Sequence, residues 1–378
     1  RGALQIMLKK GNKIAKSELQ KILVIQLGDI GDVVWTTPNL NAIKQTLPSA
    51  DLYLLTREGM ADLLKDEKSI KKIFEVHRHA YNKIKDLLLQ IELIRTLRNE
   101  NFDIAIDLRS DDRGAIMSYL SGAKYRASWY YETSVPFWRN YLFTHLSYSS
   151  HENGRVINAA DQSHRILSDF HIEMKERIPK IFIAHKVKEI MLARLREHDI
   201  SMATAVTLNP FSKKYFREWS YDKWVEIINW LWDTYHISTI LVGSIIEREK
   251  SEYIAAQCKG KLINMTGRTT LYELAALLSL SELHIGMNSA PPIIAVAVGT
   301  PTITIFGPNP PSHWIPQDEM HIVITPELEC APCGKAGCNH TGISKCLEDL
   351  KVSRVREIIR FVIEKRRGSN CSKKPDFN

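Results

Sequence analysis

The stretch KILVIQLGDIGDVVWTTP, residues 21–38, joins an apolar run to a glycine turn and then to a second apolar run. The first run, Ile22–Leu27, has the length and the β-branched residues of a buried strand. Gly28 and Gly31 follow, and Asp32 stands where a helix would begin. A glycine turn lets the backbone approach a ligand, and the N–H groups of a helix start attract anions. The stretch therefore predicts a strand–turn–helix unit with a ligand at its turn.

Asp32 has two interpretations at this point. A helix-start aspartate caps unpaired N–H groups, and a carboxylate beside a ligand also serves as a general base. The glycine spacing is not that of a dinucleotide-binding GxGxxG turn, which argues against a dehydrogenase.

Short β-rich runs alternate with helical patterns up to about residue 185 and again beyond it. Strands separated by helices of this kind form βαβ units and a parallel sheet. We expect an α/β protein with two Rossmann-like, doubly wound halves facing a central cleft, with ligands at the carboxyl ends of the strands. The predicted strands are Ile22–Leu27, Leu52–Leu55, Lys72–Val76, Phe102–Asp107, Thr204–Leu208, Ser238–Gly243, Lys261–Met265, Leu283–Gly286 and Thr302–Phe306.

The net charge of +8 lies in the two ends of the chain. Residues 1–21 carry six Lys and Arg against one Glu, and residues 364–378 carry five against two acids, so residues 22–363 are formally neutral. This distribution excludes a basic nucleic-acid groove. It fits either attraction to an anionic membrane surface or simple solvation of the ends. With no long apolar run, we expect a cytoplasmic protein, peripheral to the membrane at most.

Residues 21–38 resemble the N-terminal signature of the ADP-heptose:lipopolysaccharide heptosyltransferases, glycosyltransferase family 9, which have the GT-B fold. The resemblance implies that Asp32 is the general base and that Gly31 belongs to the donor-binding turn. The base would take the proton of the acceptor hydroxyl as it attacks the anomeric carbon. It also implies inversion at that carbon without a catalytic metal.

The second half resembles the donor-binding half of the same family. In LNPFSKKYFREW (208–219), the resemblance places Ser212 and Arg217 on the diphosphate, with Arg217 where the family usually has Lys. A fixed cation there stabilises the charge that grows on the leaving group, and an exposed basic loop is the alternative. The resemblance further places Glu247 of LVGSIIEREKSE on the ribose and the backbone near Thr269 on the adenine.

The segment HIGMNSAPPIIAVAVGTPTITIFGPNPPSHWIP (284–316) has the frame of the family's last donor motif, with departures. The family usually has Asp-Ser-Gly-Pro followed by x-His, and this chain has Asn288 for the Asp, Ala290 for the Gly and Ile293 for the His. The resemblance places Asn288 on the donor sugar and Ser289, Ala290 and Pro291 at the phosphate. The departures leave open a different donor sugar or an inactive relative.

Four cysteines cluster in residues 330–346: Cys330, Cys333, Cys338 and Cys346. This grouping is typical of a structural metal site, and free thiols are the alternative. The family often carries a similar cluster, with iron in a branch that heptosylates proteins, which implies zinc or iron here.

Charged residues after the strand Phe102–Asp107 and after Gly122 are the predicted acceptor-binding groups: Arg109, Arg113, Lys124 and Arg126. Strand-end cations suit an anionic sugar acid or phosphate, and a solvated charge cluster is the alternative.

The sequence thus predicts a basic extension (1–20), an acceptor-binding domain (21–185), a donor-binding domain (186–350) and a C-terminal helix with a basic tail (351–378). The predicted function is transfer of heptose or a similar sugar from ADP-heptose to a lipopolysaccharide inner-core acceptor. The alternatives are a protein or another glycan as acceptor, and a catalytically inactive, metal-stapled scaffold. No nucleic acid partner is expected.

Overall fold

The computed structural model describes residues 14 and 16–368, apart from 78–82, 132–135, 137, 148–157, 199, 202–204 and 312–313. Two compact units divide the chain, Arg1–Phe182 and Ile183–Asn378. Most of the predicted basic extension and the tail beyond residue 368 lie outside the described residues, as does Thr204, where one predicted strand begins.

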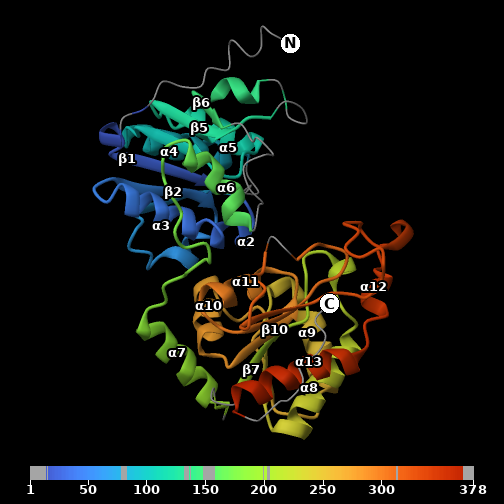
Figure 1. The fold of residues 1–378 in the computed structure, drawn as a ribbon. Helices are drawn as coiled ribbons and strands as arrows, with labels where there is room; N and C mark the ends of the chain where they lie inside the picture. Colours follow the sequence, from blue (N-terminus) through green and yellow to red (C-terminus); the bar gives the residue numbers. More distant parts are fainter. Residues whose placement is uncertain are drawn as a thin grey trace. The chain divides into compact units, whose positions relative to one another are not determined.

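The first unit contains a parallel sheet of six strands in the order β3-β2-β1-β4-β5-β6, with helices on its faces (Figure 1). This strand order is that of a doubly wound dinucleotide-binding fold. The strands are β1 (Lys21–Gln26), β2 (Asp51–Arg57), β3 (Lys72–Val76), β4 (Ile104–Asp107), β5 (Tyr125–Trp129) and β6 (His145–Ser147). The helices are η1 (Lys16–Glu18), α2 (Ile30–Val34), α3 (Thr37–Thr46), η2 (Ala61–Leu64), α4 (Lys83–Asn99), α5 (Asp112–Leu120), η3 (Arg139–Leu142) and α6 (Ala159–Ser168).

The second unit repeats this plan with a parallel sheet in the order β12-β11-β10-β7-β8-β9. Its strands are β7 (Ala205–Asn209), β8 (Ser238–Leu241), β9 (Leu262–Asn264), β10 (Leu283–Met287), β11 (Thr302–Ile305) and β12 (His321–Ile324). Its helices are α7 (His185–Arg196), η5 (Tyr215–Arg217), α8 (Tyr221–Tyr235), η6 (Ile245–Glu247), α9 (Arg248–Gln257), α10 (Leu271–Leu280), α11 (Ala290–Ala297), η7 (Cys338–His340), α12 (Lys345–Glu348) and α13 (Val352–Arg366). The predicted α/β class, with two doubly wound parallel sheets, is confirmed.

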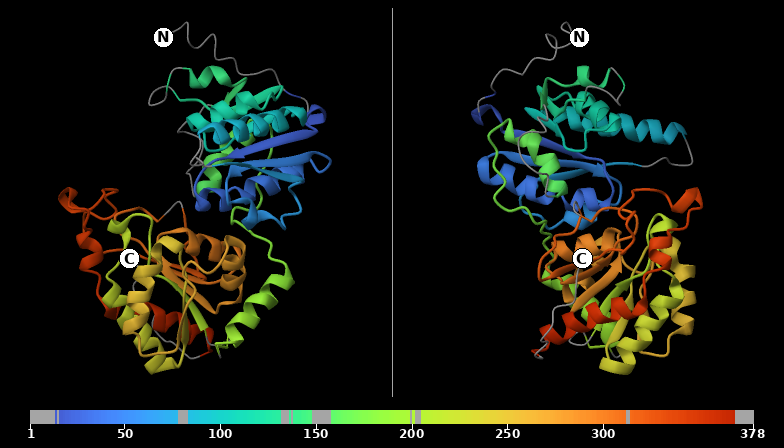
Figure 2. Two further views of the ribbon diagram at one scale, coloured as in Figure 1. Left: turned by 180° about the vertical axis from the view of Figure 1, so that it is seen from behind. Right: turned by 45° about the vertical axis from the view of Figure 1, so that its right-hand side comes forward.

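The apolar face of α13 closes the core of the second unit. Val355, Ile358 and Ile359 are buried and join the cluster that includes Trp224 and Ile228 of α8. Figure 2 shows α13 lying beside α8 in both views. α13 is therefore part of the core of the second unit, since its apolar face packs against α8.

Among the described residues, no helix is both long enough and apolar enough to cross a membrane.

Candidate functional site

Asp32 lies in the first turn of α2, directly after the carboxyl end of β1. Its Oδ2 accepts a hydrogen bond of 2.8 Å from the backbone N–H of Asp29, the N-cap residue. Asp32 thus takes part in capping the start of α2. A Cβ on Gly28 would lie 2.4 Å from both the Cβ and the Oδ2 of Asp32. The glycine turn thus makes room for the Asp32 carboxylate.

Arg109 brings a positive charge to the same carboxylate from the loop after β4. Its Nη1 lies 2.8 Å from Oδ2 of Asp32, and its Nε lies 3.0 Å from Oδ2 of Asp111. Burial raises the pKa of Asp32 and the Arg109 charge opposes that rise. A carboxylate with a raised pKa is a stronger base than a solvated one, and a neighbouring cation favours its ionised form. The pair is therefore suited to accepting a proton from a hydroxyl group.

The structure does not bring all the predicted acceptor-binding residues together. Arg113 is exposed in the first turn of α5, which like Arg109 follows the carboxyl end of β4. Lys124 precedes β5 and pairs with Glu18 at 3.0 Å, while Arg126 donates to the backbone carbonyls of Leu142 and Ala123 at 2.7 and 2.9 Å. Arg126 stands opposite Ala105 near the amino end of β4. Lys124 and Arg126 therefore lie toward the edge of the sheet opposite Asp32.

In the second unit, Asn209 joins two of the predicted donor segments. Its Nδ2 donates to the carbonyl of Val242 at 2.9 Å, and its Oδ1 accepts from the hydroxyl of Ser289 at 2.6 Å. Ser289 is thus engaged with the end of β7, and the side-chain amide of Asn288 makes no hydrogen bond among the described residues. Sequence reasoning missed Asn209, although a buried polar residue at a strand end is a recognisable signal.

Arg217 is a cation with no carboxylate partner among the described residues. It lies half-buried in η5, with its guanidinium 5.5 Å from the centre of the Phe216 ring and its Nε buried without a hydrogen-bond partner. Burial lowers its pKa, but an arginine keeps its charge in proteins. An unpaired, partly desolvated guanidinium at a strand-end loop is suited to binding an anion.

The preceding loop is held by Glu218, which sequence reasoning missed. Its carboxylate accepts the backbone N–H of Ser212 at 3.0 Å and pairs with Lys250 at 2.9 Å, and its side chain is almost fully buried. Glu218 therefore fixes the backbone of Ser212, while the Ser212 hydroxyl donates to the carbonyl of Asn288 at 3.4 Å.

Glu247 also caps its own turn. Its Oε2 accepts the backbone N–H of Ser244 at 2.6 Å and the Ser244 hydroxyl at 2.9 Å, whereas Oε1 makes no hydrogen bond among the described residues. That oxygen is free to accept a hydroxyl hydrogen bond. Thr269 is half-buried in the loop before α10, next to the Thr270 cap of that helix.

The N-terminus of α11 offers few donors to an anion. Ala290 is its first residue, and Pro291 and Pro292, which carry no N–H, occupy the next two positions. Ile293, where the family has His, is buried. An anion at this end of the sheet would therefore depend on side-chain cations more than on the helix start.

The prediction of a structural zinc or iron site at the four cysteines is not supported. Cys330 and Cys333 are exposed, Cys338 is half-buried and Cys346 is buried. Among the described residues, no group of three or more His, Cys, Asp or Glu is arranged to hold a metal ion. Burial, and next the nearby Cys338, raise the pKa of Cys346 to about 11.

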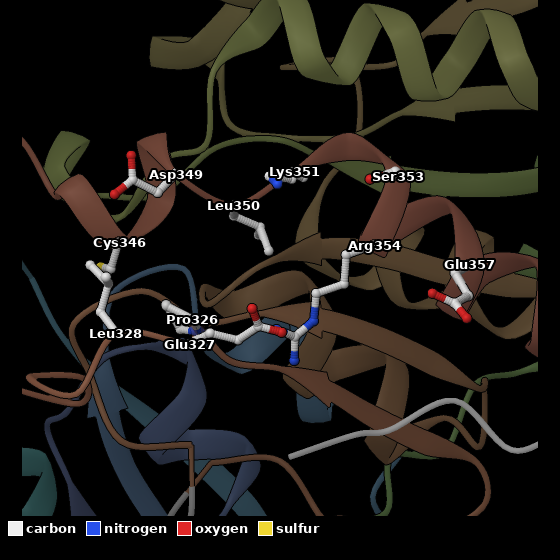
Figure 3. Close-up of a pocket in the computed structure, with 10 residues that line it drawn as sticks. All are labelled: Pro326, Glu327, Leu328, Cys346, Asp349, Leu350, Lys351, Ser353, Arg354 and Glu357. Carbon is white, nitrogen blue, oxygen red and sulfur yellow. The ribbon is translucent and has the colours of Figure 1, made fainter.

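Cys346 instead lines a cavity of about 550 Å³ near the start of α13 (Figure 3). Arg354 and Glu327 form an ion pair there. Its lining comes from the segment after β12 and from the residues around the α12–α13 connection.

Comparison with known proteins identifies the family of the chain. Residues 90–343, more than half of the chain, match glycosyltransferase family 9 (heptosyltransferase), and the chain belongs to that family. It is 27% identical over 297 residues to lipopolysaccharide heptosyltransferase 3 of Escherichia coli strain K12, covering 76% of this chain and 83% of that protein.

Two solved structures share the fold at 18% identity each. A family 9 glycosyltransferase from Veillonella parvula has a TM-score of 0.77, covering 94% of this chain and all of that one. The ADP-heptose lps heptosyltransferase II of E. coli has a TM-score of 0.73, covering 92% of this chain and 99% of that one. The chain is thus a glycosyltransferase by family.

Proposed function

We propose that this protein transfers a heptose from ADP-heptose to a lipopolysaccharide inner-core acceptor, with inversion at the anomeric carbon. The observation that carries the proposal is the Asp32–Arg109 pair at the carboxyl ends of β1 and β4, 2.8 Å apart, in a chain of the heptosyltransferase family. The relatives support both substrates, since one is named a lipopolysaccharide heptosyltransferase and another an ADP-heptose lps heptosyltransferase.

In this proposal residues 21–185 bind the acceptor and activate it. Asp32 takes the proton of the attacking hydroxyl, because its pKa is raised by burial and its ionised form is held by Arg109. Arg109 and Arg113 bind the anionic groups of the acceptor. Lys124 and Arg126 are less suited to that role, since they lie toward the other edge of the sheet.

In the same proposal residues 186–350 hold the donor. Arg217 and Ser212 bind the diphosphate, and Arg217 stabilises the charge that develops on the leaving ADP. The free oxygen of Glu247 accepts from the ribose, and the backbone near Thr269 contacts the adenine. Asn288 binds a sugar hydroxyl through its unpaired amide, at the turn formed by Ser289, Ala290 and Pro291.

The proposed place of work is the cytoplasmic face of the inner membrane, where a glycolipid acceptor is presented. The basic ends of the chain favour this location through attraction to anionic lipid.

The test is ADP release and acceptor mass in a reaction of purified protein, ADP-heptose and inner-core acceptor. Transfer should add one heptose, and Asp32→Ala should lower kcat by about 10²–10⁴-fold, the usual contribution of a general base. ADP affinity should stay near that of the unmodified protein. Transfer to a peptide instead of the glycolipid would support the protein-acceptor alternative, and no transfer from any nucleotide sugar would support the inactive scaffold.

A further inference from the structure

A buried polar network lies directly beneath the turn that carries Arg109. Asp107, the last residue of β4, is fully buried, and its Oδ1 accepts a hydrogen bond from the backbone N–H of Ser110 at 3.0 Å. Ser110 has a φ of 62°, in the left-handed region that residues other than glycine rarely adopt. The turn closed by Asp107 carries Arg109 to its contact with Asp32.

A second layer ties this turn to β5 and η3. The hydroxyls of Ser110 and Ser128 share a hydrogen bond of 2.8 Å, and Nη2 of Arg139 donates to the Ser128 hydroxyl at 3.1 Å. Arg139 is fully buried, and its Nη1 donates to the carbonyl of Trp129 at 3.0 Å. Its guanidinium lies 5.0 and 5.2 Å from the centres of the rings of Tyr131 and Phe143.

This network is not arranged as a strong stabilising ion pair. Oδ2 of Asp107 lies 4.0 Å from Nη2 of Arg139, and neither Oδ2 nor the Nε of Arg139 has a hydrogen-bond partner. Burial raises the pKa of Asp107 to about 7. Buried pairs of this kind are often replaceable by apolar residues without loss of stability. Their presence beside Arg109 therefore points to a role in the site.

The first turn of α5 packs closely against the Asp107 carboxyl group. A Cβ on Gly114, in the first turn of α5, would lie 2.4 Å from Oδ1 of Asp107. The Asp111 side chain caps the same helix by accepting the backbone N–H of Gly114 at 2.8 Å. The turn between β4 and α5 is thus fixed at both ends.

We infer that Asp107 and Ser110, supported by Arg139, are positioning residues that hold Arg109 against Asp32. The inference rests on the proposed function, because it assigns the network a role in that reaction. The charged groups that act on Asp32 are Arg109, which lowers its pKa, and Asp29, whose charge raises it. When the turn loosens, Arg109 leaves, the pKa of Asp32 rises, and the acidic limb of the rate profile moves to higher pH.

The experiment measures kcat/KM against pH from about 5 to 9 for Asp107→Ala and Asp107→Asn. The acid limb of this profile reports the base in the free enzyme. Asp107→Ala should lose kcat/KM at neutral pH, because the pKa of Asp32 rises when Arg109 leaves, and should regain part of the loss at high pH. Asp107→Asn keeps an oxygen that accepts the Ser110 N–H, so its acid limb should move less.

A second pair of variants acts on the same turn without touching the buried charges. Ser110→Gly adopts a φ of 62° without strain, whereas Ser110→Ala does not, and both lose the hydroxyl. The acid limb should therefore move further in Ser110→Ala. A purely structural role would lower the folded fraction and leave the limb in place. An unmoved limb in both Asp107→Ala and Ser110→Ala overturns the inference.

The two proposals fail in different ways. If the unmodified protein transfers no sugar, or Asp32→Ala transfers it at full rate, the proposed function is wrong whatever the turn variants do. If Asp32→Ala is inactive and the limb stays fixed in both turn variants, the positioning role alone is wrong.

Discussion

Gly28 is the position where one added methyl group tests the shape of the proposed active site. The Cβ of Gly28→Ala would lie 2.4 Å from the Cβ and Oδ2 of Asp32 and 2.6 Å from its Cγ. Ordinary van der Waals contact begins near 3.4 Å, so Asp32 or the turn must move by about 1 Å. The φ of Gly28 lies outside the left-handed region, so backbone strain does not add to the effect. A displacement of this size predicts a loss of about 10²-fold in kcat.

The assay is a double-mutant cycle of transfer rates with Gly28→Ala, Asp32→Asn and the double variant. Because Gly28→Ala acts by displacing Asp32, it should cost little once Asp32 has become Asn. ADP affinity, measured by calorimetry, should be unchanged in all three, since the proposed nucleotide contacts belong to the second unit. Additive losses, or a Gly28→Ala variant at full rate with an unchanged melting curve, would refute the reasoning.

Three further predictions concern the donor site, the buried network and the cysteines. Arg217→Ala should weaken ADP binding by roughly 1.5–3 kcal/mol, the range for a hydrogen bond to a charged group, and an unchanged calorimetric affinity would place the diphosphate elsewhere. Burial raises the pKa of Asp107 to about 7 from its ordinary value of 3.8. The folded protein therefore keeps a proton that the unfolded chain loses, and the free energy of unfolding should fall as pH rises between these two values. Melting of Asp107→Asn should lack that fall, and parallel curves for the two proteins would contradict it. EDTA should leave the melting temperature unchanged, because no metal-holding group is found among the described residues, and a lower melting temperature on chelation would restore the metal-site interpretation of the cysteine cluster. Under the proposed function EDTA should also leave the transfer rate unchanged, because Arg217 would carry the positive charge at the leaving group.

Strong periodic segments determined most of the fold prediction. The strand Lys72–Val76 has the predicted bounds, because its apolar residues repeat with the period of a strand. Three strands, β5, β6 and β12, were not predicted. The sequence of β5 is YRASW, and β6 has three residues, so neither shows a long apolar run. Both strands form by pairing with neighbouring strands of the sheet, and these long-range pairings cannot be read from the local sequence.

Individual residues of the candidate site could be predicted from the sequence, but the contacts between their side chains could not. Asp32 follows from its place after a strand, whereas its partner Arg109 lies 77 residues further along the chain. Asn209 and Ser289, 80 residues apart, meet only because β7 and β10 are neighbours in the sheet. Lys124 and Arg126 looked like strand-end residues because they follow Gly122, but that glycine precedes β5, so both lie near its beginning.

Under the proposed function, the departures in the last donor motif change which groups bind the diphosphate. Two adjacent prolines remove two N–H groups from the first turn of α11, which weakens the anion site that a helix start normally provides. Arg217 offsets this loss, because it has no carboxylate partner among the described residues and its fork of donors fits phosphate oxygens. Arg217 has no carboxylate partner and the Asn288 amide makes no hydrogen bond among the described residues, so both are available to a ligand. The second unit thus offers two groups, the Arg217 guanidinium and the Asn288 amide, that the proposed transfer would use.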